Sequence, residues 1–401
     1  MQELLFLGLF MGALGIGWFL GRREAIKVGV MLAPHGSAID KQYFIGLNYL
    51  LNEQPDEAIE TFIRALEVNP ETVETHIAIG KLFCQRGDVE RAIKVHQNLL
   101  ARPNLTALQA DRVQFELARD YLAVGLHHRA ERLLDELVDS DSSLRAEALA
   151  DLVRIHERER DWQQAVDVGR RLVKERDAFA VTLAHYHCEL AREALARKEQ
   201  QQARRHLLDA LATQRENVRA MLMLAELELA QGREREVLKW LRRLAAHDPD
   251  FVPQALPLLH RLADAGSLDL LAYLDGVLEN NQPPMMATVL ARADELNKRS
   301  GLNAASKYVL VHLQQQPSLS GLLYLIDLHK DSVEPRGHAN LMILRGIVEA
   351  LLIDKHKYRC QVCGFSGKQL HWQCPTCHGW STIRPLKGRE LAAASPSLRP
   401  I

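Results

Sequence analysis

The stretch that decides the fold is VETHIAIGKLFCQRGDVERAIKVHQNLLARPN, residues 73–104. Apolar side chains recur every three or four positions on both sides of Gly87, which predicts two amphipathic helices with a turn between them. The 34 residues before this stretch carry the same pattern in the same order. The aligned pairs are Gly46 and Gly80, Tyr49 and Phe83, and Ala58 and Ala92. The chain therefore repeats a helix pair.

This helix pair recurs through most of the chain. The small residue that begins each second helix is expected at Ala58, Ala92, Ala130, Ala165, Ala203, Val237, Leu271 and Ala305. Later unit boundaries are marked by Pro249, Pro283 and Pro317. We expect eight units from about residue 39 to residue 319, followed by a further helix near 320–331. One such unit cannot bury its apolar face alone, whereas stacked units share a core and form a superhelix with a groove.

The repeat resembles the tetratricopeptide repeat. Its small residues, its aromatic positions and its unit-closing prolines match that pattern, although the tryptophan of the first helix is absent. The match is good for the units that start near Ile39, Val73 and Asp111, and it is weaker from Ala146 to Val218. The resemblance implies an all-α solenoid whose groove binds partners, and it implies no catalytic residue.

Basic side chains are predicted to line this groove. In tetratricopeptide repeat proteins the ninth position of each first helix usually faces the concave side, and in four successive units here that position is basic. The four residues are Lys81, Arg119, Arg154 and Arg192. Other predicted groove residues, such as Arg219 and Glu157, are of mixed charge. A ladder of cations would suit a carboxylate-rich peptide or an anionic headgroup. The alternative is an ordinary solvated helix face.

The N-terminus carries an uncharged run, LLFLGLFMGALGIGWFL, from Leu4 to Leu20. As a helix with its flanks it would span roughly 30 Å, enough to cross a bilayer core. The basic residues follow the run, beginning at Arg22, and no A-x-A-like cleavage site appears. This order favours a retained anchor, with the rest of the chain in the cytoplasm, over a cleaved signal peptide or a buried helix. Another transmembrane helix could pack on the face shared by Gly8, Gly12 and Gly15, although glycine is common in membrane spans.

Four of the six cysteines lie close together in YRCQVCGFSGKQLHWQCPTCHGW, residues 358–380. Two C-x2-C pairs can place four thiolates around one ion, at about 2.3 Å for zinc. The predicted ligands are Cys360, Cys363, Cys374 and Cys377. A disulfide interpretation conflicts with the predicted cytoplasmic location. His371 and His378 are near enough to compete as ligands, but four cysteines already complete a tetrahedron.

The cysteine segment resembles a rubredoxin-type or zinc-ribbon domain. The spacing does not distinguish iron from zinc, so the predicted cofactor is one metal ion, iron or zinc. Roughly 30 residues are too few to fold on hydrophobic burial alone, and the metal is therefore expected to supply the folding free energy. We predict that this metal-binding domain has a structural or docking role, and the alternative is that it transfers electrons.

Composition and motifs exclude several classes of function. Lys and Arg number 50 against 51 Asp and Glu, a net charge of -1 that argues against a nucleic-acid-binding protein. The chain contains none of the common nucleophile, zinc-protease or phosphate-loop motifs, so we predict that it is not an enzyme. His185 and His187 are two positions apart on a helix and point in different directions, so they are not expected to share an ion.

The predicted organisation has six segments. They are a transmembrane anchor at 1–21, a juxtamembrane linker at 22–38, the solenoid at 39–333, a connecting helix at 334–357, the metal-binding domain at 358–386 and a flexible tail at 387–401.

This order of segments resembles the lipopolysaccharide assembly protein B family. The resemblance rests on the GRR that follows the span at 21–23, on the repeats, and on the CxxCGF and WxCPxCxxW knuckles. It implies a single-pass protein of the bacterial inner membrane with cytoplasmic domains. Such adaptors promote degradation of the deacetylase LpxC by the membrane protease FtsH, and a membrane-embedded regulator opposes them. Homo-oligomerisation is left open.

The sequence is compatible with two other interpretations. One is a membrane-bound redox component, in which the rubredoxin-like knuckles transfer electrons and the helical array docks a partner. The other is a secreted periplasmic scaffold, which would require cleavage near Gly21 and oxidised cysteines.

Overall fold

The computed structural model describes residues 45–46, 48–49, 57–58, 61, 73–140, 142–279, 281 and 283–387. The predicted span at Leu4–Leu20 with its three glycines, the juxtamembrane stretch 22–38, most of the first repeat unit and residues 388–401 lie outside these residues. In the described ranges, no helix has both the length and the apolar character needed to cross a membrane.

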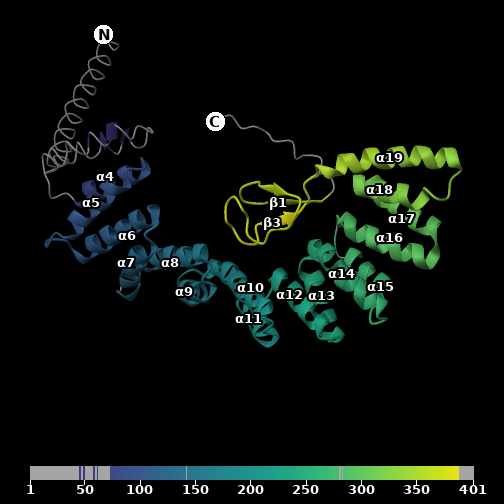
Figure 1. Cartoon of the computed structure of the whole chain (residues 1–401), viewed down its shortest axis with the longest axis horizontal. Helices are drawn as coiled ribbons and strands as arrows, with labels where there is room; N and C mark the ends of the chain where they lie inside the picture. The colour runs from purple at the N-terminus through teal and green to yellow at the C-terminus, as the bar shows by residue number, and fades with distance from the viewer. Residues whose placement is uncertain are drawn as a thin grey trace, which may run out of the picture. The chain divides into compact units, whose positions relative to one another are not determined.

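The described helices follow one another along the chain as pairs, and the two helices of a pair pack against each other (Figure 1). The pairs are α4 (Val73–Gln85) with α5 (Val89–Leu100), α6 (Ala107–Ala123) with α7 (His127–Asp139), α8 (Arg145–Glu159) with α9 (Trp162–Glu175), α10 (Ala180–Ala196) with α11 (Gln200–Thr213), α12 (Val218–Ala230) with α13 (Glu234–His247), α14 (Val252–Asp264) with α15 (Leu270–Glu279), and α16 (Met286–Ser300) with α17 (Leu302–Gln315). Short 3-10 turns, η1 (Asp177–Phe179) and η2 (Pro249–Phe251), lead into α10 and α14.

Two further helices follow the repeats. They are α18 (Leu319–His329) and α19 (Pro335–Ile353), and they pack against each other. The sequence predicted them separately, as an extra helix and as a connecting helix. In the structure they continue the series of helix pairs up to the metal-binding domain.

The chain divides into two compact units, Met1–Ile155 and His156–Ile401. In the first unit, one apolar cluster joins α4, α5 and α6 through Val73, Leu99 and Val113. In the second unit, a continuous core runs from α10 to α16. Each unit thus buries its apolar faces between successive helix pairs, as a solenoid does.

The small residues predicted at the start of each second helix are buried. Seven of them have no exposed surface, namely Ala58, Ala92, Ala130, Ala165, Ala203, Val237 and Ala305. At Leu271 the pattern slips by one position, because Leu270 and Leu274 are buried there instead. A small side chain at this point allows the two helices of a pair to approach closely, which explains why alanine recurs.

The turn inside six successive pairs contains one residue with a left-handed backbone. Four of these residues are glycines, among them Gly87, where the sequence predicts a turn, and two are not glycine. The six are Gly87 (φ 83), Gly125 (φ 76), Arg160 (φ 59), Lys198 (φ 63), Gly232 (φ 70) and Gly266 (φ 73). Left-handed backbone is unfavourable for residues that have a Cβ atom, so Arg160 and Lys198 store strain that the glycines avoid.

Lys198→Gly is therefore expected to stabilise the second unit by about 0.5–1 kcal/mol, since relief of the strain exceeds the extra entropy of the unfolded chain. The matched reverse change is Gly232→Ala, where an added Cβ would meet no atom within 4 Å, so that only the backbone is disturbed. It should destabilise by about 1 kcal/mol. Thermal unfolding checks both. If both variants melted at the same temperature as the parent chain, the left-handed backbone of Lys198 would not be strained.

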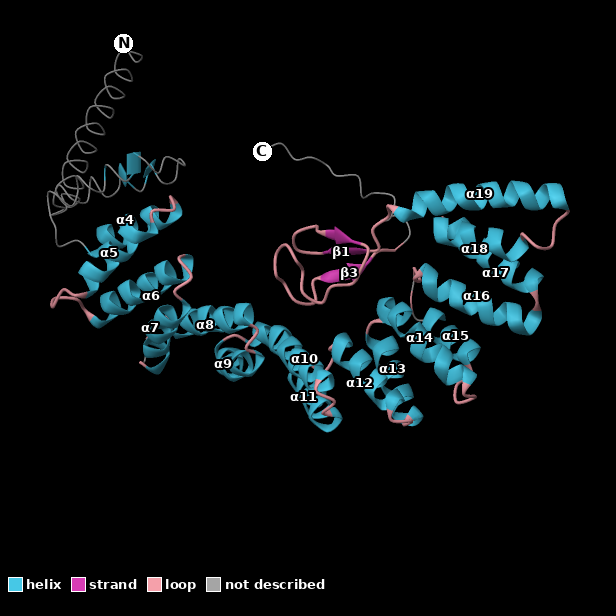
Figure 2. Ribbon diagram, in the orientation of Figure 1, coloured by secondary structure: helices cyan, strands magenta, loops and turns pink. Residues whose placement is uncertain are grey.

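A small antiparallel sheet follows α19 (Figure 2). Its strands are β1 (Tyr358–Cys360), β2 (Ser366–Gly367) and β3 (Ile383–Pro385), in the order β2-β1-β3. In the register, Tyr358 lies opposite Gly367 on one side and Pro385 on the other. We call residues 358–387 the ribbon.

Candidate metal centre

The four cysteines of the ribbon converge as the sequence predicts. Their sulfur atoms all lie within 4.8 Å of one another. The Sγ atoms of Cys360 and Cys377 are 3.7 Å apart, and those of Cys363 and Cys374 are 3.6 Å apart. Tetrahedral ligands at about 2.3 Å from an ion would be separated by about 3.8 Å. A disulfide requires about 2.05 Å, so these thiols are not bridged, and they fit one metal ion.

The two C-x2-C loops share one backbone pattern. The N–H group of Cys360 donates to the carbonyl of Phe365 over 2.7 Å, and the N–H group of Cys374 donates to the carbonyl of Gly379 over 2.9 Å. In both loops the residue after the second cysteine has a left-handed backbone. These residues are Gly364 (φ 77) and His378 (φ 56). Each loop therefore folds back around its first cysteine and directs both sulfurs to one point.

The two histidines near the cysteines have other positions. His378 occupies the left-handed turn of the second loop, and its N–H group donates to the carbonyl of Cys374 over 2.9 Å. The ring of His371 lies 6.4 Å from the ring of Phe365, at a steep angle. Neither belongs to the group of residues that could hold the ion. The four thiols form the complete set.

The thiol of Cys360 is prepared to ionise. Desolvation opposes the charged form, but N–H groups of Cys363 and Val362 and the nearby Thr382 side chain outweigh it and lower the pKa of this thiol to about 6. The thiolate is the form that binds metal, so the loop favours this form at Cys360. At Cys363 a backbone hydrogen bond from Phe365 lowers the pKa, but desolvation and the neighbouring thiols outweigh it and raise the pKa to about 11.

The ribbon does not stand apart from the helices of the second unit, because its Trp380 is buried among their side chains. The Trp380 ring stacks on His185 with 4.9 Å between centroids, and it meets the edges of Tyr186 at 6.0 Å and Trp162 at 6.5 Å. Only 9% of Trp380 is exposed. An aromatic side chain of this size contributes strongly to a contact between domains.

The carboxylate of Glu157, near the end of α8, holds this aromatic cluster together. It accepts hydrogen bonds from the Tyr186 hydroxyl (2.6 Å), from Nε1 of Trp380 (3.0 Å) and from the Gln373 amide. Hydrogen bonds to a charged group contribute about 1.5–3 kcal/mol each, more than neutral ones. Glu157 thus joins α8, α10 and the ribbon at one point.

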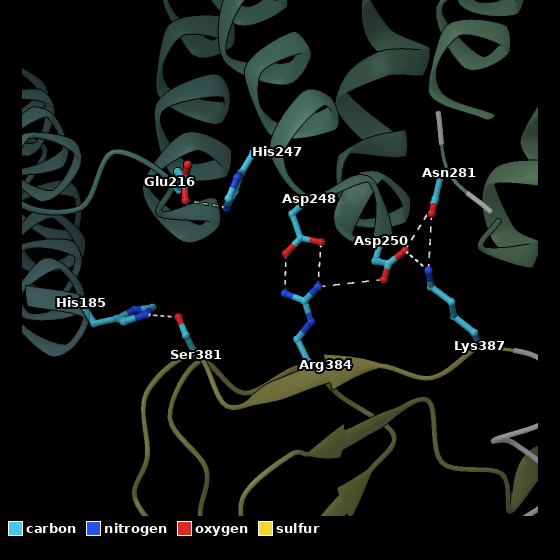
Figure 3. A network of polar contacts seen from close by, with 9 residues as sticks. All are labelled: His185, Glu216, His247, Asp248, Asp250, Asn281, Ser381, Arg384 and Lys387. Carbon is cyan, nitrogen blue, oxygen red and sulfur yellow. Dashed lines mark hydrogen bonds and ion pairs between the residues drawn. The ribbon is translucent and has the colours of Figure 1, made fainter. Parts of the chain in front are cut away.

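A second group of contacts lies around β3 (Figure 3). The guanidinium of Arg384 pairs with both carboxylate oxygens of Asp248, one of them at 2.9 Å, and it covers the ring of Phe251 at 5.0 Å. The ammonium of Lys387 is 2.6 Å from a carboxylate oxygen of Asp250. Asp248 is 7% exposed, so its charge depends on Arg384 for compensation. Two separate groups of contacts therefore hold the ribbon.

The ribbon contacts the first helices of four successive pairs, in addition to Trp162 and the connection at residues 248–251. The solenoid residues that touch it include Glu157 of α8, His185 of α10, Arg219 of α12 and Gln254 of α14. The sequence predicted that this helix face would line a groove open to partners, and it named Glu157 and Arg219 there. In the second unit, part of this face is covered by the chain's own ribbon, which sequence reasoning missed.

His185 makes the ribbon contact sensitive to pH. Its Nε2 lies 2.6 Å from the Ser381 hydroxyl, and its ring is covered by Trp380. Burial, with a smaller effect of Arg219, lowers its pKa to about 3. The ring is therefore neutral when the ribbon is docked and would titrate near 6.5 when exposed.

Acidification is expected to loosen this contact. Below pH 6.5 the exposed ring binds more protons than the docked ring, so docking weakens as the pH falls from about 6.5 towards 3, by up to about 1.4 kcal/mol per pH unit. Tryptophan fluorescence of the metal-loaded chain, followed between pH 7 and pH 5.5, measures the change. His185→Gln should flatten the profile. An unchanged slope in this variant would contradict the role of His185.

The predicted basic ladder is paired with acids of the solenoid. In the first unit Lys81 lies 2.8 Å from Glu116, and Arg119 and Arg154 each lie 3.1 Å from the buried carboxylate of Asp151. Two arginines sharing one carboxylate leave a net positive charge. Their side chains are 48% and 61% exposed, so this charge is presented to solvent.

The fourth ladder residue belongs to the second unit. Arg192 lies 2.5 Å from Glu189, which also pairs with the buried Arg219 at 2.9 Å. The arrangement of two arginines on one buried carboxylate thus occurs again. Binding of a partner by these four cations stays a prediction.

Together these features define a class: a tetratricopeptide repeat protein that carries a rubredoxin-type metal centre on its helices. The family model of the tetratricopeptide repeat matches residues 45–103, 115–180 and 188–250, and that of the rubredoxin metal binding domain matches residues 358–385. A tetratricopeptide repeat protein of Parabacteroides merdae, with a known crystal structure, aligns with 73% of this chain and 99% of its own at 10% identity and a TM-score of 0.36.

Two relatives match over their whole length. Lipopolysaccharide assembly protein B of Escherichia coli K12 is 34% identical over 394 residues, which cover 97% of this chain and 100% of the relative. The protein of the same name from Haemophilus influenzae is 32% identical over 408 residues, with the same coverage. The chain belongs to the lipopolysaccharide assembly protein B family.

Proposed function

We propose that this chain is a membrane-anchored cytoplasmic adaptor that regulates lipopolysaccharide synthesis by promoting FtsH-dependent proteolysis of LpxC. The observation that carries the proposal is the full-length match to relatives named lipopolysaccharide assembly protein B. In this chain the repeats and the metal-binding domain occur together. The broader role in lipopolysaccharide assembly rests on these names alone. The particular partners rest on the family resemblance.

The architecture supports an adaptor. Helical repeats present extended surfaces for protein partners, and the ribbon adds a rigid, metal-dependent element to one such surface. No catalytic step is part of the proposal. The chain would act by bringing a client to a protease.

Membrane anchoring by Leu4–Leu20 is part of the same proposal. Tethering confines the repeats to the inner face of the membrane and raises their effective concentration near any partner anchored there. The glycine face at Gly8, Gly12 and Gly15 would be the contact with FtsH or with the opposing membrane-embedded regulator.

Membrane fractionation and co-purification test this proposal. The full chain should sediment with inner membranes and retain FtsH and LpxC when purified in mild detergent. A chain that lacks residues 1–21 should be recovered in the soluble fraction and should lose FtsH, while its helical content is kept. Recovery of FtsH with this soluble chain at the level of the full chain would contradict the anchoring role.

The ladder is the proposed site for an acidic client segment, and the structure shows how to test it. Reversing Arg119 or Arg154 to Glu would place a second carboxylate beside the buried Asp151. Arg154→Gln is the better change, because it adds no charge and Arg119 still compensates Asp151. We expect client binding to weaken about three- to tenfold, with a reduced dependence on salt. Arg170→Gln, on an exposed ion pair of α9, is the control. Equal affinities in all three chains would exclude the site.

A further inference from the structure

We propose that His187, His206 and Asp209 form a second site for a divalent transition-metal ion, between helices α10 and α11. One ligand atom from each of these side chains lies within 4.8 Å of those of the other two. His206 and Asp209 are three residues apart on α11 and therefore share a helix face. His187 faces them from α10, and its ring centroid is 6.4 Å from that of His206.

An unpartnered nitrogen points to a missing ligand at this position. His187 is 2% exposed, and its Nδ1 is buried without a hydrogen-bond partner among the described residues. Buried polar atoms are nearly always satisfied, and an exception calls for an explanation such as an ion. The neighbouring His185 is not available to it, because that ring contacts Ser381 and Trp380 of the ribbon.

The geometry is open enough for an ion to enter. His206 is partly exposed and Asp209 is exposed, so the cluster is reached from solvent while His187 closes its inner side. Ligands at about 2.0–2.1 Å from a tetrahedral zinc ion would be about 3.3 Å apart, and rotation of the exposed Asp209 can close the difference. Three protein ligands leave one position for water.

The charges that face the cluster permit binding. Arg170 of α9 faces both histidines, and Asp167, which pairs with it at 3.5 Å, faces His187. Arg197, just beyond the end of α10, faces His206. Burial lowers the pKa of His187 to about 4 and also lowers the pKa of His206.

The donor set separates this site from the four-cysteine centre. Two imidazoles and one carboxylate suit zinc, nickel, cobalt or copper, whereas four thiolates bind more tightly and more selectively. An ion here would join α10 to α11. Since α10 also carries His185 and Tyr186, it would stiffen the helix on which Trp380 of the ribbon rests.

Zinc stoichiometry in the full chain tests the proposal. The ribbon is first loaded and excess metal removed by gel filtration, and Zn²⁺ is then titrated by calorimetry. We expect one additional ion per chain, and we expect the double variant His206→Ala, Asp209→Asn to lose its binding by at least about tenfold. Both changed side chains are accessible, so circular dichroism should match the parent chain.

The control is His128→Ala, an exposed histidine 3.6 Å from Glu131, which should still take up the second ion. Cobalt in the second site should show no thiolate-to-metal absorption, because the ligands are nitrogen and oxygen. Absence of a second ion in the parent chain would overturn the proposal. So would a second ion that the double variant binds with unchanged affinity.

Discussion

Replacing Cys360 and Cys363 by serine is expected to unfold the ribbon and to leave the helices of the second unit folded. Metal binding contributes about 10–16 kcal/mol to the folding of small zinc domains, far more than the few buried apolar side chains of the ribbon can supply. We expect metal content to fall from one ion per chain in the ribbon to nearly none. Trp380 would then leave its aromatic cluster, so proteolysis after Asp354 should become fast.

The control for this experiment is Cys84→Ser, which removes a thiol of α4 outside the ribbon. It should leave the metal content and the protection from proteolysis unchanged. Elemental analysis of the parent chain also identifies the ion. Zinc would remove the redox interpretation, whereas iron with a reversible one-electron couple would support it. A double serine variant that stays protected would show that the ribbon folds without its metal.

Trp380→Ala is expected to release the ribbon without unfolding it. The change removes the ring that packs on His185, Tyr186 and Trp162, and it leaves the Glu157 carboxylate with one partner fewer. Truncation of a buried tryptophan typically costs about 3–5 kcal/mol. The four thiols are untouched, so the ion should be retained. Hydrogen exchange should increase in α10 and in the connection at residues 354–357.

Two phenylalanine variants separate the contributions to this contact. Trp380→Phe keeps most of the ring and loses the hydrogen bond to Glu157, so docking should weaken by about 1–3 kcal/mol. Trp240→Phe, in α13, is the matched control, because Nε1 of Trp240 is buried without a hydrogen-bond partner among the described residues and no hydrogen bond to them is lost. Ribbon protection that survives Trp380→Ala would mean that the remaining contacts, chiefly those of Arg384 and Lys387 around β3, are enough to hold the ribbon.

Periodic features of this fold could be predicted from sequence. The helix pairs, the alanines at their contacts and four turn glycines follow from patterns local to one unit, and the metal ligands follow from the spacing of two C-x2-C pairs. The left-handed Arg160 and Lys198 could not be predicted, because nothing local marks a residue that the neighbouring helices force into that conformation.

The ribbon contact could not be predicted for a different reason. It joins residues more than a hundred positions apart, such as Asp248 with Arg384 and Glu157 with Trp380, and no local pattern encodes such pairs. One signal was present: a domain of about 30 residues with two tryptophans cannot bury both rings by itself. Similarly, the position of the ladder arginines within each repeat could be predicted, but their acidic partners could not. These acids lie on another turn of the same helix or in the next helix pair.

The half-life of LpxC in cells tests the central claim of an anchored adaptor most directly. After depletion of this chain, LpxC should be degraded several-fold more slowly, and re-expression of the parent chain should restore fast turnover. The chain with Cys360 and Cys363 changed to serine, or without residues 1–21, should fail to restore it. An LpxC half-life that depletion does not change would contradict the account.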